Sequence, residues 1–420
     1  MKNILFKFIS AAICAVAFNA CGAEVNAALS EIPEEKLTEM TMQANDIAFS
    51  FYKQKAANKD KNFFFSPYSM RSAFAMAREG AKGDTAEEMN KVFSFPSDNA
   101  EMRLAMQAMG EAVSQAAKGS KFSDANSFWA NKKYKFLNEY TSSLKKNYKA
   151  AAENVDFAND TEGARKKINS WTSSKTNGII KELFAEGSLD PLTRLVLVNA
   201  VYFKGTWKEA FGKNATFEAD FYLNSGEKSK ADLMRHEDET HFPYAQKENA
   251  QFLAMPYKNG GDSSGTGLEM MVILPADKKS FEKTEKELSS SYIAEVRKEM
   301  SREQVRVFLP KFKFSSTHEL NDDLKAMGMP LAFSDKADFS GMTGDNELKI
   351  GTAIQKAFID VSEEGTEAAA ATAVAMTLKA VAIARPSYIF RADKPFIFLI
   401  RDVKTGLILF MGKVENPKAA

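Results

Sequence analysis

Residues 363–386 read EEGTEAAAATAVAMTLKAVAIARP. The positions from 366 to 385 contain neither glycine nor proline, so no turn residue interrupts them. Alanine, the best helix former, dominates the stretch, whereas the interleaved Thr372 and Val374 favour strands. Propensity alone therefore leaves helix and strand open.

The same stretch separates into two faces when alternate positions are compared. Charged Glu367 and Lys379 fall on the odd face, as they would in a strand with one buried side. The even positions carry only small or apolar side chains, namely Thr366, Ala368, Ala370, Thr372, Val374, Met376 and Leu378. About thirty residues without turn chemistry separate the flanking predicted strands 353–361 and 395–401, which is unusual unless the connection is functional. We therefore expect a functional loop that can lie in a sheet.

The composition is that of a folded chain with a large core. Of 420 residues, 45% are hydrophobic and 33 are phenylalanine, which excludes a disordered chain. Lys+Arg (56) and Asp+Glu (55) balance, so no global basic field favours nucleic acid or an anionic membrane. The length permits two domains or one large one. Because neither an internal repeat nor a long linker divides the body, we expect a single domain over residues 37–420.

The N-terminus predicts an export signal over residues 1–21, in which lysines precede an apolar run that ends in small residues. Its last residue, Cys21, lies in a context that resembles the lipobox of bacterial lipoproteins, although Phe18 stands where leucine is usual. We expect lipidation of Cys21, residues 22–36 as a tether, and a place at the cell envelope or surface. The alternative is an ordinary cleavage near residues 15–17 or after Ala20, which leaves a freely secreted protein.

Both cysteines of the chain, Cys14 and Cys21, belong to this N-terminal segment. We therefore expect no disulfide in the body, whose stability must come from packing. No later stretch reaches 18 apolar residues, so membrane contact is expected only through an N-terminal lipid.

The pattern of the body changes near residue 195. The first part is mainly helical in pattern, with helices expected at 37–55 and at 69–78, the second after the start signal Ser66-Pro67. The later part contains short apolar or alternating runs that predict strands. These runs are LVLVNAVYF, QFLAMPY, LEMMVILP, VRVFLPKFKF, PFIFLIRD and LILFMGKV. Because helices and strands are partly segregated in the sequence, the predicted class is α+β.

Catalytic interpretations find little support. Residues 261–265 fit the G-x-S-x-G pattern but lie between two predicted strands, which indicates a hairpin loop rather than a nucleophile elbow. The three histidines show no zinc spacing, and we place His236 and His241 in a solvated loop. No phosphate-binding loop or dinucleotide fingerprint occurs, so no cofactor is expected. The lysines at 132–135 and 145–149 are expected on a solvated helix face.

Several separate motifs then appear in an order that resembles the serpin family, over residues 37–417. They are NFFFSPYSMRSAFAMAREGAKGDTAEEM (62–89), INSWTSSKTNGIIKELF (168–184), LVLVNAVYFKGTWKEAF (195–211), LPKFKF (309–314), ELNDDLKAMGM (319–329), EEGTEAAAATAV (363–374) and KPFIFLIRDVKTGLILFMGKVENP (394–417). The resemblance implies three β-sheets, eight or nine helices and an exposed reactive loop over about residues 363–392.

The resemblance also implies a mechanism and its partners. A serine protease, sometimes a cysteine protease, attacks the loop and forms an acyl-enzyme; the cut loop then inserts into the central sheet as a new strand and traps the enzyme covalently. This is the activity of an inhibitor, not of an enzyme, and we expect a monomer. The alternative on the same scaffold is a non-inhibitory carrier or chaperone.

The hinge of this chain suits insertion. The hinge residues implied by the resemblance are Glu363, Gly365, Thr366, Glu367, Ala368, Ala369, Ala370, Ala371 and Thr372. A charge at Ala368 or Ala370 would be buried without a partner and would cost several kcal/mol. Burial of the larger residues 374, 376 and 378 would contribute about 5 to 10 kcal/mol. The hinge therefore favours inhibition over the carrier alternative.

The interval customary in inhibitory serpins places the reactive bond fourteen residues after Gly365, between Lys379 and Ala380. Lys379 would fill the acidic pocket of a trypsin-like protease. Other bonds remain open for elastase-like, chymotrypsin-like or trypsin-like enzymes, at Val374, Met376, Leu378 and Arg385.

Further positions transfer by motif. Ser66, Ser69 and Asn199 match the polar cluster that controls opening of the central sheet, and Trp207 matches the tryptophan where the loop enters. Gln355 stands where the family usually has a histidine, so an amide replaces the pH-sensitive member.

Overall fold

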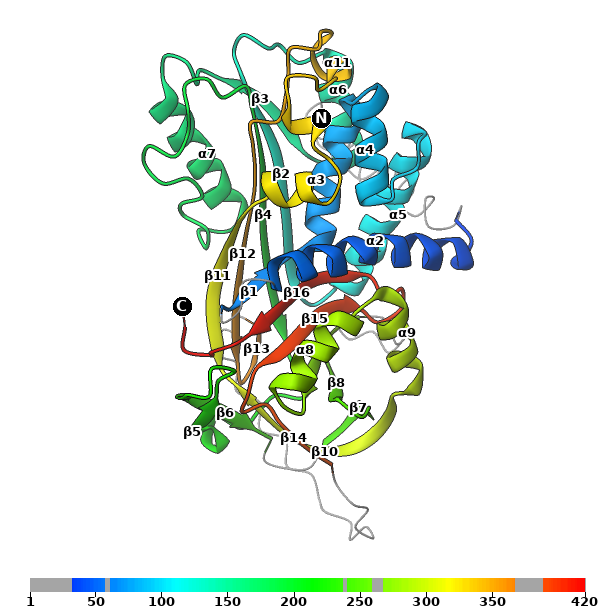
Figure 1. The fold of residues 1–420 in the computed structure, drawn as a ribbon, viewed down its shortest axis with the longest axis vertical. Helices are drawn as coiled ribbons and strands as arrows, with labels where there is room; N and C mark the ends of the chain where they lie inside the picture. Colours follow the sequence, from blue (N-terminus) through cyan, green and yellow to red (C-terminus); the bar gives the residue numbers. More distant parts are fainter. Residues whose placement is uncertain (1–31, 57–60, 237–239, 259–266, 367–387, 420) are drawn as a thin grey trace, which may run out of the picture.

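The computed structural model describes residues 32–56, 61–236, 240–258, 267–366 and 388–419 (Figure 1). The helices are α2 (Glu34–Ala56), α3 (Pro67–Gly80), α4 (Gly83–Phe93), α5 (Asn99–Ala116), α6 (Asn138–Ser143), α7 (Thr161–Lys175), α8 (Lys278–Glu287), α9 (Ser290–Glu299), α10 (Asn321–Ala326) and α11 (Ser340–Thr343). Short helical turns are η1 (Leu144–Tyr148), η2 (Lys213–Ala215) and η3 (Leu331–Phe333). None of these described helices combines the length and apolar character needed to cross a membrane.

The strands belong to two hydrogen-bonded sheets in the described residues. The six-stranded sheet has the order β11 (Phe312–Glu319), β12 (Thr352–Ser362), β13 (Gly365–Thr366), β4 (Leu195–Thr206), β2 (Lys121–Asn131) and β3 (Ala151–Val155). The ten-stranded sheet contains β1 (Phe63–Phe65), β16 (Ile408–Val414), β15 (Phe396–Asp402), β9 (Leu268–Pro275), β8 (Ala250–Pro256), β7 (Thr240–Gln246), β10 (Ser301–Pro310), β6 (Lys228–Arg235), β5 (Phe217–Tyr222) and β14 (Tyr388–Arg391).

Strand β10 explains why two sheets are seen where three were expected. Its first half pairs with β7, and its last residues pair with β6, so one strand joins what would otherwise be two separate sheets. Strand β14 runs parallel to β10 between these contacts. The predicted α+β class is confirmed, with ten α-helices in the described residues against the eight or nine expected; the shortest, α11, spans four residues.

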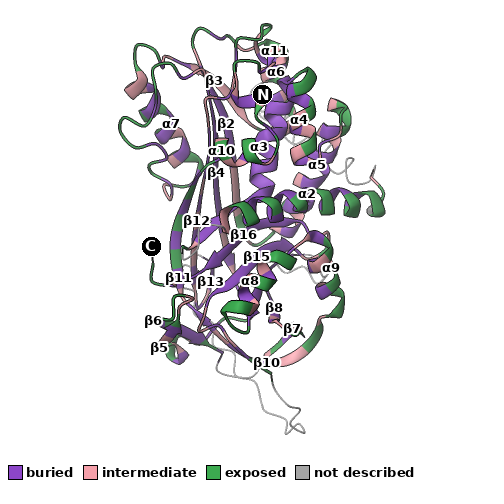
Figure 2. Cartoon of the chain, in the orientation of Figure 1, coloured by how far each residue is buried: buried purple, intermediate pink, exposed green. Residues whose placement is uncertain are grey.

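Two layers of helix cover the upper part of the six-stranded sheet, with α7 on one side and α3 on the other (Figure 1). The alternation of β4 explains this arrangement. Val196 and Val198 pack with Ile168 of α7, whereas Leu195 and Leu197 belong to the same core as α3. Every residue of α3 is buried (Figure 2). Because both faces are covered, the central strand is mostly apolar, as its sequence indicated, and Asn199 is the buried exception near its middle.

The lower part of the six-stranded sheet packs against the ten-stranded sheet. Val201 and Phe203 continue the inner face of β4 and share a core with Phe398 and Phe410. Within this core, the Phe64 and Phe410 rings stack 4.9 Å apart. The fold therefore gives β4 one inner face along its whole length, first against α3 and then against the second sheet.

The prediction of a mainly helical first half was incomplete. The helices at 37–55 and 69–78 are confirmed as parts of α2 and α3, but β2 and β3 also lie in this half. Lysines 132–135 lie in the turn after β2 rather than on a helix, while lysines 145 and 146 lie in η1. The lysine cluster is thus a turn and a short helical segment, and the expected single helix face was wrong.

The predicted environment of His236 was also wrong. The side chain is buried, 4.1 Å from the Phe211 ring, and its Nε2 lies 3.2 Å from the Glu209 carbonyl oxygen. Burial lowers its pKa. His241, by contrast, is exposed on β7. The pattern at 261–265 lies outside the described residues, although the flanking strands β8 and β9 pair with each other as expected.

Candidate functional site

The site begins where two neighbouring strands separate. From Thr352 to Phe358, β12 pairs directly and in parallel with β4. Beyond this point β13 lies between them and pairs in antiparallel fashion with both. Gly365 is opposite Ser362 and Thr206, and Thr366 is opposite Val361 and Gly205. The chain that leaves β12 thus turns back at once and occupies the first two positions of a slot in the sheet.

Glycine is required at the first of these positions. A Cβ atom on Gly365 would lie 2.0 Å from the Gly205 carbonyl oxygen and 2.8 Å from the Thr206 Cα, distances that real Cβ atoms do not show. The φ angle of +152° is also one that other residues rarely adopt. The turn from β12 into the slot therefore depends on the absence of a side chain at 365.

Two glutamates hold the turn from outside the sheet. The Glu363 carboxylate accepts a hydrogen bond of 2.8 Å from the Thr216 hydroxyl and forms an ion pair of 3.1 Å with Lys311. Burial acts to raise the pKa of Glu363, but hydrogen bonds from its own backbone, Thr216 and Lys311 outweigh this, and the pKa is lowered. Glu364 pairs with Lys213 at 2.5 Å. These contacts fix where the loop leaves β12.

Aromatic residues line the entrance to the slot. The Trp207 indole stacks on Tyr257 at 4.5 Å, and its Nε1 donates to the Ser362 carbonyl oxygen at 3.0 Å. The Trp207 backbone N–H donates to the Glu364 carbonyl oxygen at 2.9 Å. Tyr257 in turn has its hydroxyl 2.7 Å from the Thr366 hydroxyl, which is buried. The side chain of Thr366 therefore points to the inner face of the sheet.

A buried polar cluster lies further along β4, beneath the place where β4 and β12 still pair. Gln355 is opposite Asn199 in that pairing, and its amide donates to the Asn199 side-chain oxygen. The same Gln355 amide exchanges two hydrogen bonds with the Ser66 backbone, of 2.8 and 2.9 Å. Asn199 donates to Ser69 and, at 2.5 Å, to Asn126. The cluster thus bridges the two strands that separate at the slot.

The start of α3 supplies two members of this cluster. Ser66 is the N-cap residue, followed by Pro67, and its hydroxyl accepts from the Ser69 backbone at 3.1 Å. The same hydroxyl donates to the Leu409 carbonyl oxygen at 2.6 Å, which ties the cap to the second sheet. A local helix-start signal therefore also positions the polar groups under the sheet.

Two further members, Asp124 and Asn126, were missed at the level of sequence. Asp124 accepts hydrogen bonds from the Ser69 hydroxyl and, at 2.8 Å, from the Asn126 amide. Burial raises the pKa of Asp124 to about 6, although hydrogen bonds from Ser69, Asn126 and Ser72 act to lower it. Two polar residues at alternate positions of one strand face the same side, but this signal is informative only once residues 121–131 are known to be a strand.

The structure separates the five predicted sheet-opening residues into two places. Trp207 lies at the slot entrance, directly after the end of β4. The other four contact one another in the buried cluster, namely Ser66, Ser69, Asn199 and Gln355. Trp207 thus lies where β13 separates β4 from β12, and the cluster lies where β4 and β12 pair directly. Of the predicted hinge, the structure describes Glu363, Gly365 and Thr366.

The remaining predicted positions lie outside the described residues. They are Glu367, Ala368, Ala369, Ala370, Ala371, Thr372, Val374, Met376, Leu378, Lys379, Ala380, Arg385 and Cys21. The described chain resumes at β14, so both ends of the predicted reactive loop are strands of different sheets.

The slot offers backbone hydrogen-bonding groups of two strands and an apolar inner face, which suit an added strand. Over the described ranges of the chain, no group of three or more His, Cys, Asp or Glu side chains gathers as metal ligands would.

Comparisons with known proteins agree with this geometry. The family model for Serpin (serine protease inhibitor) matches residues 42–417. A serpin-like protein of Thermococcus kodakarensis is 41% identical over 89% of this chain and 85% of its own length. Leukocyte elastase inhibitor A of Rattus norvegicus is 38% identical over 87% of this chain and 96% of its own.

Among solved structures, human thyroxine-binding globulin in complex with thyroxine has a TM-score of 0.81 and 29% identity, over 91% of this chain and 100% of that one. The relatives thus include a protein named as a protease inhibitor and one that binds thyroxine. The family match spans most of the chain, and the fold and the slot agree with it. This chain belongs to the serpin family.

Proposed function

We propose that this protein is an irreversible suicide-substrate inhibitor of serine proteases, which traps the acyl-enzyme when its cut loop inserts between β4 and β12. The observation that carries the proposal is the register of β13, which already pairs with both strands. The relatives named above include an elastase inhibitor, which supports a protease as the partner. The role is that of a trap, not of an enzyme.

The register of β13 predicts the course of insertion. Each further pair of residues in the slot would move the pairing back by two positions on both neighbours. The even loop positions 368, 370, 372 and 374 would then lie between Phe203 and Ile359, Val201 and Ala357, Asn199 and Gln355, and Leu197 and Ala353. Cross-strand partners share a face, so these even positions would follow Thr366 onto the inner face.

The inner face accepts the side chains that the loop carries. Val201, Phe203, Ala357 and Ile359 all belong to the buried core beneath the slot. The loop offers alanine at both positions that would meet them, 368 and 370. Alanine adds a strand there without a bulky or charged group that the core would have to accommodate.

Thr372 has a special place in this register. It would come to lie between Asn199 and Gln355, whose side chains now hydrogen-bond directly across the closed part of the sheet. Insertion must break that bond, and the Thr372 hydroxyl, with one donor and two acceptor sites, could bond both amides in its place. We propose that this exchange keeps the polar cluster satisfied in the inserted state.

The proposed reactive bond is Lys379–Ala380, with a trypsin-like protease as the target. A lysine side chain suits the acidic pocket of such enzymes. Bonds after Val374, Met376, Leu378 or Arg385 are the alternatives for other serine proteases, and cysteine proteases are further candidate partners by the same chemistry of attack.

The test is to mix the chain from residue 22 onward with trypsin and to run denaturing gel electrophoresis with mass spectrometry of the released C-terminal peptide. We expect a band near the summed mass that survives boiling and a peptide that begins at Ala380. A Lys379→Ala variant should lose the band with trypsin. Complete cleavage of the wild-type loop without any such band would overturn trapping for trypsin, and a peptide with another start would move the reactive bond.

The second candidate is a non-inhibitory carrier, since a thyroxine-binding protein has the same fold. The two candidates differ in the fate of the protease after it cleaves the loop. A carrier would be cut by elastase-like, chymotrypsin-like and trypsin-like enzymes in turn without retaining any of them. That result across all three classes would favour the carrier.

We further propose that the chain is exported and lipidated at Cys21, in the cell envelope or at the cell surface. The test is metabolic labelling with a fatty acid in a bacterial host, with Cys21→Ser and Cys14→Ser as a matched pair. Only Cys21→Ser should lose the label. Equal labelling of both variants would exclude lipidation at Cys21.

A further inference from the structure

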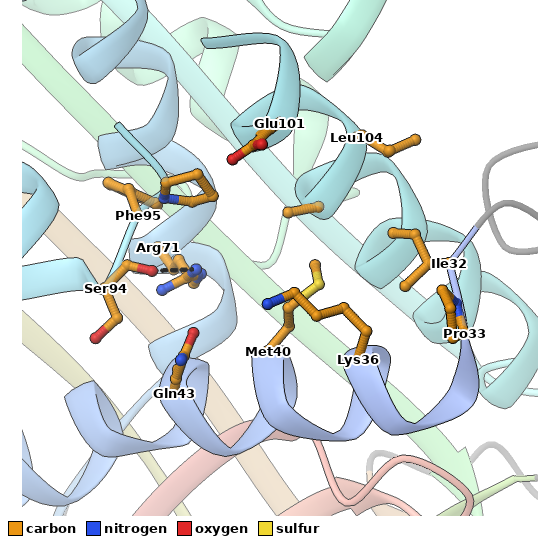
Figure 3. A pocket seen from close by; sticks show the side chains of 12 residues that line it. Ile32, Pro33, Lys36, Met40, Gln43, Arg71, Ser94, Phe95, Glu101 and Leu104 are labelled. Atoms are coloured by element: carbon orange, nitrogen blue, oxygen red, sulfur yellow. Dashed lines mark hydrogen bonds between the residues drawn. The ribbon is translucent and has the colours of Figure 1, made fainter. Parts of the chain in front are cut away.

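A groove of about 630 Å³ lies between α2, α5 and the loop that joins α4 to α5 (Figure 3). Its volume is within the range of roughly 300 to 1,000 Å³ that is usual for small-molecule sites. None of its lining residues belongs to the strands of the slot. Most of the lining is apolar, with Ile32, Pro33, Met40, Phe95, Leu104 and Ala105.

One charged side chain, Arg71 of α3, reaches this groove from within the fold. It is only 2% exposed, and Figure 3 shows it beside Ser94 and above Gln43 in the view. Its guanidinium donates to the Phe93 carbonyl oxygen and, at 3.2 Å, to that of Ser94. The Phe95 ring centroid lies 4.8 Å away. The positive charge is thus held in a fixed place beside an apolar surface.

The charge of Arg71 has no carboxylate partner among the described residues. Its contacts there are neutral carbonyl oxygens and an aromatic ring, and its Nε has no hydrogen-bond partner. Burial lowers the pKa of Arg71 to about 10. A buried cation without a counter-ion is unusual, because removal from water is costly unless a negative charge compensates it.

The other charges at the groove are one lysine and two glutamates. Lys36 forms an ion pair of 3.1 Å with Glu39, one turn along α2. Glu101, at the start of α5, also lines the groove and is exposed; in Figure 3 it lies on α5, across from the side chains of α2. Among the described residues, the groove therefore presents one buried positive charge without a direct ion-pair partner, rather than a broad basic field. This arrangement suits a ligand with one negative charge and disfavours a polyanion.

We propose that this groove binds a small amphipathic monoanion, a carboxylic acid with an apolar body such as a medium-chain fatty acid. The carboxylate would lie at Arg71, where guanidinium groups bind carboxylates by charge-assisted hydrogen bonds. The apolar body would lie along Met40 and Leu104. The ligand would supply the counter-ion that the fold lacks and would cover the apolar lining.

The test compares decanoate with decanol by isothermal titration, below the concentration at which decanoate forms micelles, with the chain from residue 22 onward. The two probes share a hydrocarbon body and differ in charge. We expect saturable binding of decanoate that is at least about tenfold tighter than binding of decanol, as expected for a hydrogen bond between charged groups. Equal affinities, or no saturable binding of decanoate, would overturn the proposal.

Variants locate the site. Leu104→Trp would fill the groove and leave Arg71 in place, so the affinity for both probes should fall at least about tenfold. Leu192→Trp changes a side chain elsewhere that is 85% exposed, and it should leave both affinities unchanged. Arg71→Met should reduce decanoate to the affinity of decanol. If Arg71→Met fails to fold, Leu104→Trp with its control Leu192→Trp, together with the comparison of decanoate and decanol, still tests the proposal. An affinity for decanoate that is the same in Leu104→Trp as in the wild type would contradict the proposal that decanoate binds in this groove.

The chain's own N-terminal segment is the competing occupant, because Ile32 lines the groove. A chain that begins at Ile32 should bind decanoate as the longer chain does. If only the shortened chain binds decanoate, residues 22–31 occupy the groove, and the proposal of a small-molecule ligand is overturned.

Discussion

At the scale of single residues, the carboxyl of Asp124 sets how the polar cluster responds to pH. Its hydrogen-bond partners are hydroxyl and amide groups, and burial raises its pKa to about 6 from a usual value of 3.8. Between these two values the folded chain holds a proton that the unfolded chain has lost. Asp124 therefore contributes stability below about pH 4, and this contribution is lost as the pH rises through about 6.

We predict that replacing Asp124 by asparagine removes this dependence. Relative to Asp124→Asn, the wild type should lose about 1 to 2 kcal/mol of unfolding free energy between pH 4 and pH 7, less than the pKa difference implies because the side chain is partly exposed. Denaturant unfolding at both pH values measures the difference. A wild-type-minus-variant difference that is constant with pH would contradict the assignment.

The comparison with the variant is needed because His318 acts in the opposite direction. Its Nε2 lies 3.0 Å from the Phe64 carbonyl oxygen, and burial lowers its pKa to about 4. The unfolded chain binds a proton at this side chain between about pH 6.5 and 4, while the folded chain does not. Its contribution is present above pH 6.5 and is lost as the pH falls. The two effects overlap in the wild type.

Gly365 is the residue on which the turn into the slot depends. We predict that Gly365→Ala displaces β13, because its Cβ would collide with the Gly205 carbonyl oxygen. The expected loss of unfolding free energy is about 1 to 3 kcal/mol, with a change in the fluorescence of Trp207, which bonds to Ser362.

The matched control for this prediction is Gly226→Ala. Gly226 also has a positive φ, +92°, but nothing lies within 4 Å of the added Cβ. This variant should show backbone strain alone and should leave the Trp207 signal unchanged. The same fluorescence change in both variants would rule out the collision as its cause.

At the scale of elements, the strong periodic runs were predictable and the interrupted ones were not. The apolar run of β4 and the start signal at Ser66 gave correct elements, because local sequence carries both signals. Strand β2 was missed because its polar Asp124 and Asn126 face a hydrogen-bonded cluster instead of solvent. The tertiary partner, not the local pattern, explains such residues.

The sequence predicted those residues of the candidate site that lie in family motifs, but not those that distant strands bring to it. Motifs identified Asn199 and Gln355, which the structure brings into contact. Tyr257 and Lys311 were missed, because their roles arise only when distant strands place them beside the hinge at Thr366 and Glu363. Sequence spacing carries no signal for such contacts.

The register of β13 makes a prediction for the inserted strand as an element. Ala370→Arg would place a charge on the inner face between Val201 and Ala357, whereas Ala369→Arg would place it on the opposite face. We expect Ala370→Arg to lower the fraction of trypsin trapped at least about tenfold and Ala369→Arg to change it less than about twofold. Counting trapped against cleaved chains on a gel measures this. Equal losses in the two variants would mean that the register does not continue as proposed.

At the scale of the whole molecule, the intact chain should be less stable than its cleaved product. Insertion adds a strand with two new ladders and buries residues 374, 376 and 378, which contributes roughly 5 to 10 kcal/mol from apolar burial alone. We predict that cleavage within the loop raises the midpoint of thermal unfolding by about 10 °C or more. Calorimetry of intact and cleaved chains measures this shift. An unchanged midpoint would show that the cut loop stays outside the sheet.

The pairing of β13 with two neighbours has a further consequence for how the sheet fills. The first two-residue step would meet no existing β4–β12 pairs, and each later step would break two of them and form four new ones. The net number of strand pairs therefore rises with every step, and reversal becomes steadily harder. A strand advances about 3.3 Å per residue, so each step corresponds to about 7 Å of travel. An arginine at a chosen even position would arrest the strand after a known distance. A series of such variants would measure how far a bound protease must be moved before it loses its activity.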